Sequence, residues 1–301
     1  MPAIAGDEIL WHDPGQVEAL DLWWGPGGRE NAPAPPYTFA KEDLSGTTAK
    51  VNVVDRNGRN WNIKFGPEVP GECFGSRMMW AAGYFIEPTY FVPEGRIEAL
   101  KHLSKRAREV IGKDGSFRSA RFQLRTPAFK FVDGHNWAWT NNPFQGTHEL
   151  AGLKILIMLV SNWDNKDARD VDVGINTAIF ERQMEPRYVY TFTDWGESMG
   201  GWGYYTNRKP WSCELFTSET DDFVSVGDGD IRWGYVGRHA SFKKGITPED
   251  IRWILQYIGR ITDKQLSDGL RASGATREQA ECFTSALRRR FDMLKTVSAS
   301  R

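Results

Sequence analysis

The sequence predicts an α+β protein, with a small antiparallel sheet in its N-terminal part and a larger, mostly helical C-terminal part. Residues 50–55 and 60–65 alternate polar and apolar side chains around Asn57-Gly58, which is a strong signal for a β-hairpin. Residues 148–160 are nearly all apolar in their second half, so they predict a buried helix. Three helical segments are expected to end the chain: one capped by residues 247–250, then residues 262–270 and 276–294.

The segments between these landmarks predict further elements. Residues 1–36 are rich in Pro and Gly and indicate an irregular N-terminal arm. Residues 197–245 are Gly-rich and aromatic, and we expect a long, mobile connection there. The other expected elements are a helix over 72–84, strands over 89–92, 96–100 and 117–124, a basic helix and turn within 101–116, and a hairpin over 173–180 and 187–192.

Length and composition limit the class of protein. The chain has 301 residues, of which 40% are hydrophobic and 26% charged, and this is ordinary for a globular protein of one large domain or two lobes. The net charge of −1 provides no broad basic surface, so nucleic acid is not expected as a partner. No run of 18 apolar residues occurs, and no membrane span is therefore predicted.

The cysteines and the N-terminus bear on the compartment. Cys73, Cys213 and Cys282 lack metal-ligand spacing, and an odd number of cysteines cannot form a complete set of disulfides. This pattern favours a reducing compartment. The first residues lack the basic and apolar regions of a signal peptide, so a cytoplasmic location is favoured, while export with removal of a leader stays open.

Polar residues at the start of the first hairpin are typical of a phosphate site. The loop before the first strand is small and polar: Ser45, Gly46, Thr47 and Thr48. Its N–H groups and hydroxyls suit phosphate oxygens. Lys64 lies between two apolar residues in the second strand, where a cation is unusual. Glu72, in the helix that follows, is a candidate partner for Lys64, and Glu68 is the alternative.

Two carboxylate-rich segments follow the buried helix and the second hairpin. Asp164 and Lys166 lie in a polar loop at the end of the apolar helix, where Asp164 would orient a hydroxyl and Lys166 would neutralise phosphate. Asp170 or Asn176 would supply a second oxygen ligand to a metal. Asp194 follows an apolar strand, as a metal-binding carboxylate often does, and Mg²⁺ prefers such oxygens.

The order of these parts matches the needs of phosphoryl transfer: a cover over the phosphates, a Lys held by a Glu, metal-binding carboxylates and an Asp for the acceptor. The sequence therefore predicts a phosphotransferase that uses ATP and Mg²⁺ (or Mn²⁺) to phosphorylate a hydroxyl. The acceptor, a protein or a small molecule such as a sugar, stays open. The predicted regions are an arm (1–36), an N-terminal lobe with the nucleotide-binding hairpin and helix (37–125), and a C-terminal lobe with the catalytic loop (126–301).

With these motifs, the chain resembles the atypical kinase-like superfamily, especially its HipA-type and phosphatidylinositol-kinase-type members. It is also similar to uncharacterised bacterial proteins with an Asn-Trp-Asp-x-Lys-Asp motif. The matching residues are Lys64; Glu72, Ser76, Arg77, Trp80, Ala81, Gly83 and Tyr84; residues 142–150; residues 162–167; and residues 194–196. The resemblance covers roughly residues 40–200.

The resemblance implies a bilobal, protein-kinase-like fold with the nucleotide between the lobes. It implies that Lys64 contacts the α and β phosphates, that Glu72 orients Lys64, that Asp164 is the catalytic Asp and that Asp194 is the principal metal ligand. The family usually has an Asn five or six positions after the catalytic Asp, where this chain has Arg169 and Asp170. The loop at 45–48 is also not a full Gly-x-Gly-x-x-Gly.

These departures keep two alternatives open. The first is a pseudokinase or nucleotide-binding module without turnover. The second is a hydrolase built on paired carboxylates such as Asp164 and Asp194, which would act without ATP.

Overall fold

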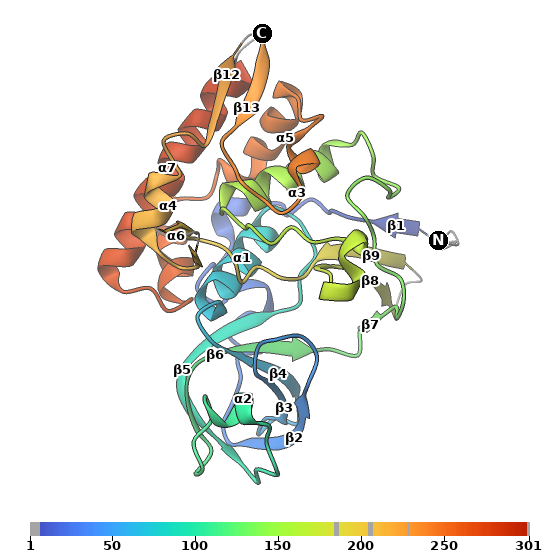
Figure 1. Cartoon of the computed structure of the whole chain (residues 1–301), viewed down its shortest axis with the longest axis vertical. Coiled ribbons are helices and arrows are strands. Elements are labelled where there is room, and N and C mark those ends of the chain that lie inside the picture. The colour runs from blue at the N-terminus through green and yellow to red at the C-terminus, as the bar shows by residue number, and fades with distance from the viewer. Residues whose placement is uncertain (1–6, 184–186, 204–206, 228, 300–301) are drawn as a thin grey trace.

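The computed structural model describes residues 7–183, 187–203, 207–227 and 229–299. Five strands in the N-terminal part form a closed barrel in the order β2-β3-β4-β6-β5, at the bottom of Figure 1. The strands are β2 (Tyr37–Asp43), β3 (Lys50–Val54), β4 (Asn60–Phe65), β5 (Thr89–Glu98) and β6 (Ser116–Arg125). The chain is thus of mixed α+β class, as predicted.

The alternation in the first hairpin decides which side chains enter the barrel. Val51 pairs with Ile63 across β3 and β4, which confirms the predicted hairpin. Trp61, Ile63 and Phe65 are buried inside the barrel. Because side chains alternate along a strand, Asn62 and Lys64 of β4 point to the opposite, outer face.

Three elements of the barrel differ from what the sequence predicted. β2 was not predicted as a strand. β5 runs without interruption through Pro93 and Gly95, where two short strands were expected. The predicted basic helix within residues 101–116 is reduced to one short helix, α2 (Lys105–Arg108). The barrel pairs β5 with β6 along most of its length, and this pairing outweighs the local effect of Pro93.

The larger part of the chain has a core of its own, built from helices and one sheet. Its helices are α1 (Val69–Ala81), α3 (His148–Leu159), α5 (Pro248–Ile258), α6 (Asp263–Arg271) and α7 (Arg277–Ala299). The sheet has the order β1-β9-β8-β7, with β1 (Asp7–Ile9), β7 (Phe129–Phe131), β8 (Thr177–Arg182) and β9 (Arg187–Phe192). Short 3-10 turns lie at Val17–Ala19, Gly25–Gly27, Ala168–Val173 and Ala240–Lys243.

The predicted helices of this part are confirmed. Nearly all of α3 is buried, as its apolar sequence indicates. Thr247 and Asp250 form a capping box at the start of α5, because each side chain bonds to the backbone N–H of the other. α1 lies between the barrel and the helices (Figure 1), so its residues contribute to both.

The expected mobile connection at residues 197–245 is wrong for the described residues of that segment. It contains α4 (Cys213–Ser218), β10 (Gly201–Trp202), β11 (Arg208–Lys209), β12 (Val224–Gly227) and β13 (Asp230–Trp233). Phe216 and Phe223 are buried in the larger core. The glycines reflect close packing: a Cβ on Gly200 would lie 1.9 Å from the carbonyl oxygen of Lys209.

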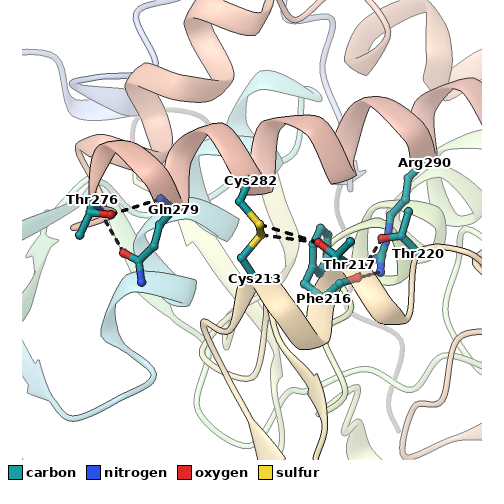
Figure 2. The surroundings of a disulfide bond; sticks show 8 residues. All are labelled: Cys213, Phe216, Thr217, Thr220, Thr276, Gln279, Cys282 and Arg290. Atoms are coloured by element: carbon teal, nitrogen blue, oxygen red, sulfur yellow. Dashed lines mark hydrogen bonds between the residues drawn. A yellow bond between two sulfur atoms is a disulfide. The ribbon is translucent and has the colours of Figure 1, made fainter.

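A disulfide joins Cys213 of α4 to Cys282 of α7, as Figure 2 shows. The two residues are 69 positions apart, and their Cα atoms are 6.3 Å apart. Cys73 remains a free, buried thiol. One cysteine stays unpaired, as the odd count requires, but the disulfide argues against the reducing compartment inferred from that count, because disulfides persist in oxidising compartments. None of the described helices is long and apolar enough to cross a membrane.

Candidate functional site

Three cations lie in one row across neighbouring strands of the barrel. Lys50 of β3 pairs in register with Lys64 of β4, and Lys64 pairs with Arg121 of β6. Residues in one such row point to the same face of a sheet, and this face is turned toward α1. Lys64 was predicted from sequence, whereas Lys50 and Arg121 were not.

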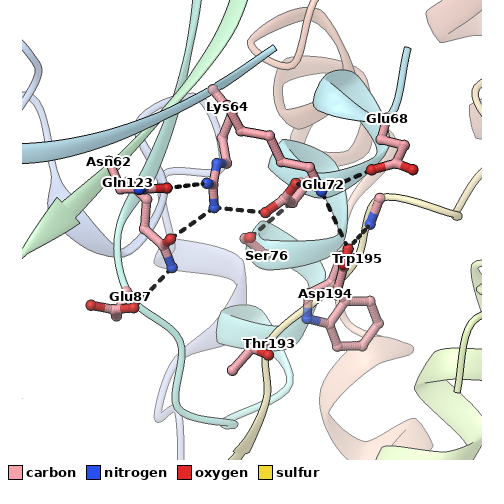
Figure 3. Close-up of polar contacts among 12 residues, drawn as sticks. Asn62, Lys64, Glu68, Glu72, Ser76, Glu87, Gln123, Thr193, Asp194 and Trp195 are labelled. Atoms are coloured by element: carbon pink, nitrogen blue, oxygen red, sulfur yellow. Dashed lines mark hydrogen bonds and ion pairs between the residues drawn. The ribbon is translucent and has the colours of Figure 1, made fainter. Parts of the chain in front are cut away.

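The start of α1 supplies the counter-charges. The ammonium of Lys64 lies 2.8 Å from Oε2 of Glu68 and 3.0 Å from Oε2 of Glu72 (Figure 3). Lys64 therefore contacts both of the carboxylates that the sequence left as alternatives. Lys64 is 6% exposed and Glu72 4%, so the ion pair is buried.

Arg121 holds Glu72 from the other side. Its Nη1 lies 2.6 Å from Oε1 of Glu72 and donates to Oε1 of Gln123 at 2.8 Å. Its Nη2 donates to Oδ1 of Asn62 at 2.9 Å. Each oxygen of Glu72 therefore faces a cation, which fixes the carboxylate in the buried site.

Asp194 reaches the same ammonium from a third element. It follows β9, and its Oδ1 lies 3.7 Å from Nζ of Lys64. Oδ1 also accepts a hydrogen bond of 3.0 Å from the N–H of Gly196. Burial opposes the charge on Asp194, but Lys64 and the Gly196 N–H outweigh it and hold the pKa of Asp194 below its usual value. Burial likewise opposes the charge on Lys64, but Asp194, Glu72 and Glu68 raise its pKa.

Gly196 allows α1 and the segment after β9 to approach each other. A Cβ at this position would lie 2.8 Å from Cβ of Glu68, which is closer than real Cβ atoms come. Close packing against Glu68 therefore explains why a glycine lies two positions after Asp194. It keeps Asp194 and Glu68 on either side of Lys64.

Asp164 and Lys166 lie together in the loop after α3. Nζ of Lys166 is 3.1 Å from Oδ2 of Asp164. The N–H of Asp164 donates to Oδ1 of Asn162, and Nδ2 of Asn162 donates to the carbonyl of Asp194 at 2.9 Å. Asn162 thus connects the backbones of Asp164 and Asp194. Oδ1 of Asp164 is buried and accepts no hydrogen bond from the described residues.

Asn176 adds a second connection between these segments. Its Nδ2 donates to the carbonyl of Asp164 at 2.6 Å. Its own carbonyl accepts from the N–H of Thr193 at 2.7 Å. Because Thr193 directly precedes Asp194, Asn176 lies beside the backbone of both aspartates, and its role as a metal ligand stays a prediction.

Asp170 lies in a different group of charges. It accepts from Nε2 of His239 at 2.7 Å, and Nε of Arg238 is 3.5 Å away. Among the described residues, Asp167, Asp170 and His239 bring one possible ligand atom each within 4.8 Å of one another. Arg169 contacts Asp167 at 2.8 Å, so this group already contains cations and is an ion-pair cluster.

The predicted phosphate loop lies beside this site. Residues 45–48 connect β2 to β3, and the N–H of Phe65, next to Lys64, donates to the carbonyl of Ala49 at 3.2 Å. Nζ of Lys50 donates to Oγ of Ser45 at 2.9 Å. The row of cations therefore begins at the base of the loop.

Glu197 is a titratable group that the sequence did not single out. Burial, the neighbouring carboxylate of Glu68 and the charge of Asp164 raise its pKa to about 7, against an opposing effect of Arg208. Its side chain is 25% exposed, and its Oε2 lies 3.8 Å from Nε of Arg208. Glu197 follows Asp194 by three positions, so the site holds a carboxyl that stays protonated below neutral pH.

The stability of the protein should depend on this proton. The usual pKa of a Glu is 4.5, so between that pH and about 7 the folded state holds a proton that the unfolded state has lost. The free energy of unfolding contributed by Glu197 should therefore fall as the pH rises through this interval. Glu197→Gln, which mimics the protonated form, should flatten this dependence in urea unfolding from about pH 5 to about pH 8. Glu214→Gln, on the exposed side of α4, is the control, and equal slopes in both variants would contradict the assignment.

Two cavities lie away from these residues. One, of about 1100 Å³, is lined by the β5 and β6 ends, the residues after α2 and residues 65–67. The other, of about 500 Å³, lies between the N-terminal arm and α6. Neither is lined by Lys64, Glu72, Asp164 or Asp194.

The comparisons with known proteins do not name a family. No protein-family model matches the sequence, and no curated protein matches it. One solved structure that matches is the "Crystal structure of the golgi casein kinase", with 9% identity over 89% of this chain and 74% of that chain, and a TM-score of 0.37. Similarity at this level assigns no family, so membership of the atypical kinase-like superfamily stays a prediction.

Proposed function

We propose that this chain is a phosphotransferase that uses ATP and Mg²⁺ or Mn²⁺ to phosphorylate a hydroxyl group. The observation that carries the proposal is the buried ammonium of Lys64, which contacts Glu68, Glu72 and Asp194 from two separate segments of the chain. A nucleotide would lie between the barrel and the larger core, which would then act as two lobes. The regions 1–36, 37–125 and 126–301 belong to this proposal.

The row of cations suits a polyphosphate. Lys64 would contact phosphate oxygens while Glu72, fixed by Arg121, keeps the ammonium in place. Lys50 adds a second ammonium at the base of the 45–48 loop. Phosphoryl transfer depends mainly on positioning the phosphates and on stabilising their negative charge. Cations held in fixed positions can do both.

The residues around Asp194 fit a divalent cation. The side chain of Asp194 is 37% exposed, and its contacts with Lys64 and Gly196 both involve Oδ1, which leaves Oδ2 for a ligand. Asn176 lies between Asp194 and Asp164. Mg²⁺ commonly takes one or two protein oxygens and fills its other positions with water and phosphate. Asp194 and Asn176 would hold the ion, which would neutralise charge on the phosphates. Asp170 would join this metal site only if its hydrogen bond to His239 and its ion pair with Arg238 were broken.

Asp164 would receive the acceptor. Its buried Oδ1 lacks a hydrogen-bond donor among the described residues, and a substrate hydroxyl would supply one. Asp164 would orient this hydroxyl and take its proton, and Lys166 would remain on Oδ2 and offer its charge to the transferred phosphoryl group.

The first test is thermal unfolding with ATP, with and without Mg²⁺ or Mn²⁺. A ligand that binds only the folded state raises the melting temperature, so wild type should shift with metal and ATP together. Asp194→Asn should lose the metal-dependent part of the shift, because the ion loses its charged ligand. Asp172→Asn, an exposed position in the 3-10 turn at Ala168–Val173, is the control. The absence of any shift in wild type at millimolar ATP would overturn the proposal.

A nucleotide-binding module without turnover is the second candidate. The position of Asp170 favours this candidate. The resemblance to kinase-like proteins would use Asp170 as a second metal ligand, but its carboxylate accepts a hydrogen bond from His239 instead. A metal-independent ATP shift without ADP formation would support it. Hydrolysis of a substrate in the absence of ATP would instead support the hydrolase built on Asp164 and Asp194.

A further inference from the structure

The loop at residues 45–48, called the cover loop below, is held from a distant part of the chain. Nη1 of Arg106 donates to the carbonyl of Gly46 at 2.6 Å, and its Nη2 donates to the carbonyl of Asp43 at 3.2 Å. Arg106 lies on α2, 60 positions after Gly46. One guanidinium therefore holds both the start of the cover loop and the end of β2.

A second contact fixes α2 against the same strand. The N–H of Ser104 donates to Oε2 of Glu42 at 2.8 Å, and its hydroxyl donates to Oε1. Ser104 is also the N-cap of α2, since its Oγ accepts from the N–H of Ala107. α2 is thus anchored to β2 at its start, which places Arg106 at a fixed point beside the loop.

The near end of the cover loop is fixed from within the barrel. The N–H and the hydroxyl of Ser45 donate to Oδ1 of Asp43 at 3.0 and 2.6 Å. Lys50 donates to Oγ of Ser45. The loop therefore has polar contacts on its side chains and carbonyls although it is largely exposed.

The backbone N–H groups after Ser45 in the cover loop, in contrast to its carbonyls and side chains, have no hydrogen-bond partner among the described residues. Among the described residues, none accepts a hydrogen bond from the N–H of Gly46, Thr47 or Thr48. Arg106 occupies the carbonyl of Gly46 and leaves these donors available. Successive free N–H groups in a turn are a common way to bind phosphate oxygens.

We propose that Arg106 is a positioning residue that pre-orders the cover loop, with its N–H groups free for the triphosphate of a nucleotide. This inference rests on the proposed function. Phosphate-covering loops lose conformational freedom when a ligand orders them, and a loop that is already held loses less. The short helix α2, which makes no hydrogen bond or ion pair with Lys64 or Asp194 among the described residues, would thereby raise nucleotide affinity.

The test measures the binding of a non-hydrolysable ATP analogue with Mg²⁺ by calorimetry. Arg106→Ala should bind about tenfold more weakly than wild type, because the loop must be ordered on binding. Arg106→Lys should recover part of the loss, since an ammonium still reaches one carbonyl. Arg108→Ala is the matched control: it lies on the same short helix, is exposed and has no polar contact of its side chain among the described residues. If the wild type turns over ATP, KM for ATP should rise in Arg106→Ala while kcat changes little.

Amide hydrogen exchange without nucleotide gives a readout that does not depend on the proposed function. Exchange at Gly46, Thr47 and Thr48 should be faster in Arg106→Ala than in Arg108→Ala, with the rest of the barrel unchanged. Unchanged exchange and unchanged affinity in Arg106→Ala would overturn the inference while wild-type binding still stands. If the wild type binds no nucleotide but the exchange rates rise as expected, the proposed function fails and Arg106 remains a clamp on the loop without a nucleotide role, which also overturns the inference as stated.

Discussion

Replacing Asp164 with Asn is expected to lower kcat for ADP formation by about 10²- to 10⁴-fold, the usual contribution of a positioned acid or base. Asn keeps the shape of the side chain but cannot take the proton of the acceptor hydroxyl. Asp164 contacts Lys166 and, through its backbone, Asn162 and Asn176, so the variant retains its place in the loop. Initial rates of ADP formation from Mg-ATP measure the effect.

The same variant should still bind nucleotide. Lys64, Glu72 and Asp194 are unchanged in it, so the metal-dependent rise in melting temperature should equal that of the wild type. Asp172→Asn should retain full activity because it is exposed. A kcat in Asp164→Asn within about threefold of the wild type would remove Asp164 from the chemistry.

Replacing Lys64 with Met is expected to lower the free energy of unfolding by about 3 kcal/mol and to abolish the ATP-dependent shift. The loss of the ammonium leaves Glu72 buried with only Arg121 as a counter-charge, and it leaves Glu68 and Asp194 facing each other as like charges. Because Arg121 remains, we expect the lower end of the usual cost for breaking a buried pair. Urea unfolding measures this change.

A second substitution separates the charge effect from packing. Glu68→Gln added to Lys64→Met removes one of the two like charges that face each other when the ammonium is lost, so the double variant should recover part of the lost stability. Lys41→Met, at an exposed position of β2, is the control and should change stability little. A double variant less stable than either single one would show that Lys64 and Glu68 act independently, contrary to the ion pair between them in Figure 3.

The sequence was informative where a residue departs from its local pattern. Lys64 interrupts an apolar strand, and Asp194 follows one, and both reach the same site. The loop after α3 was recognised because a charged segment rarely follows a buried helix, and Asp164, Lys166 and Asn176 do meet there. Local patterns of this kind fix which side chains are turned inward at the end of an element.

Other parts depend on register and on contacts between distant segments. Arg121 joins the site only because β6 pairs with β4 at Lys64, and no local pattern in β6 indicates this pairing. Arg106 meets Gly46 across 60 positions, and Cys213 meets Cys282 across 69. The raised pKa of Glu197 depends on Glu68, which lies on another element. Contacts of this kind depend on how distant segments fold together, so the spacing of residues along the sequence does not reveal them.

The disulfide gives the C-terminal third of the chain a covalent topology that the sequence order does not suggest. The link between Cys213 and Cys282 encloses β12, β13, α5 and α6 in a closed ring. If a protease cut the backbone once inside this ring, the two pieces would stay joined through sulfur and would migrate as one species until a reductant was added. α7 would therefore remain tied to α4 after such a cut, and the fragment would not diffuse away (Figure 2).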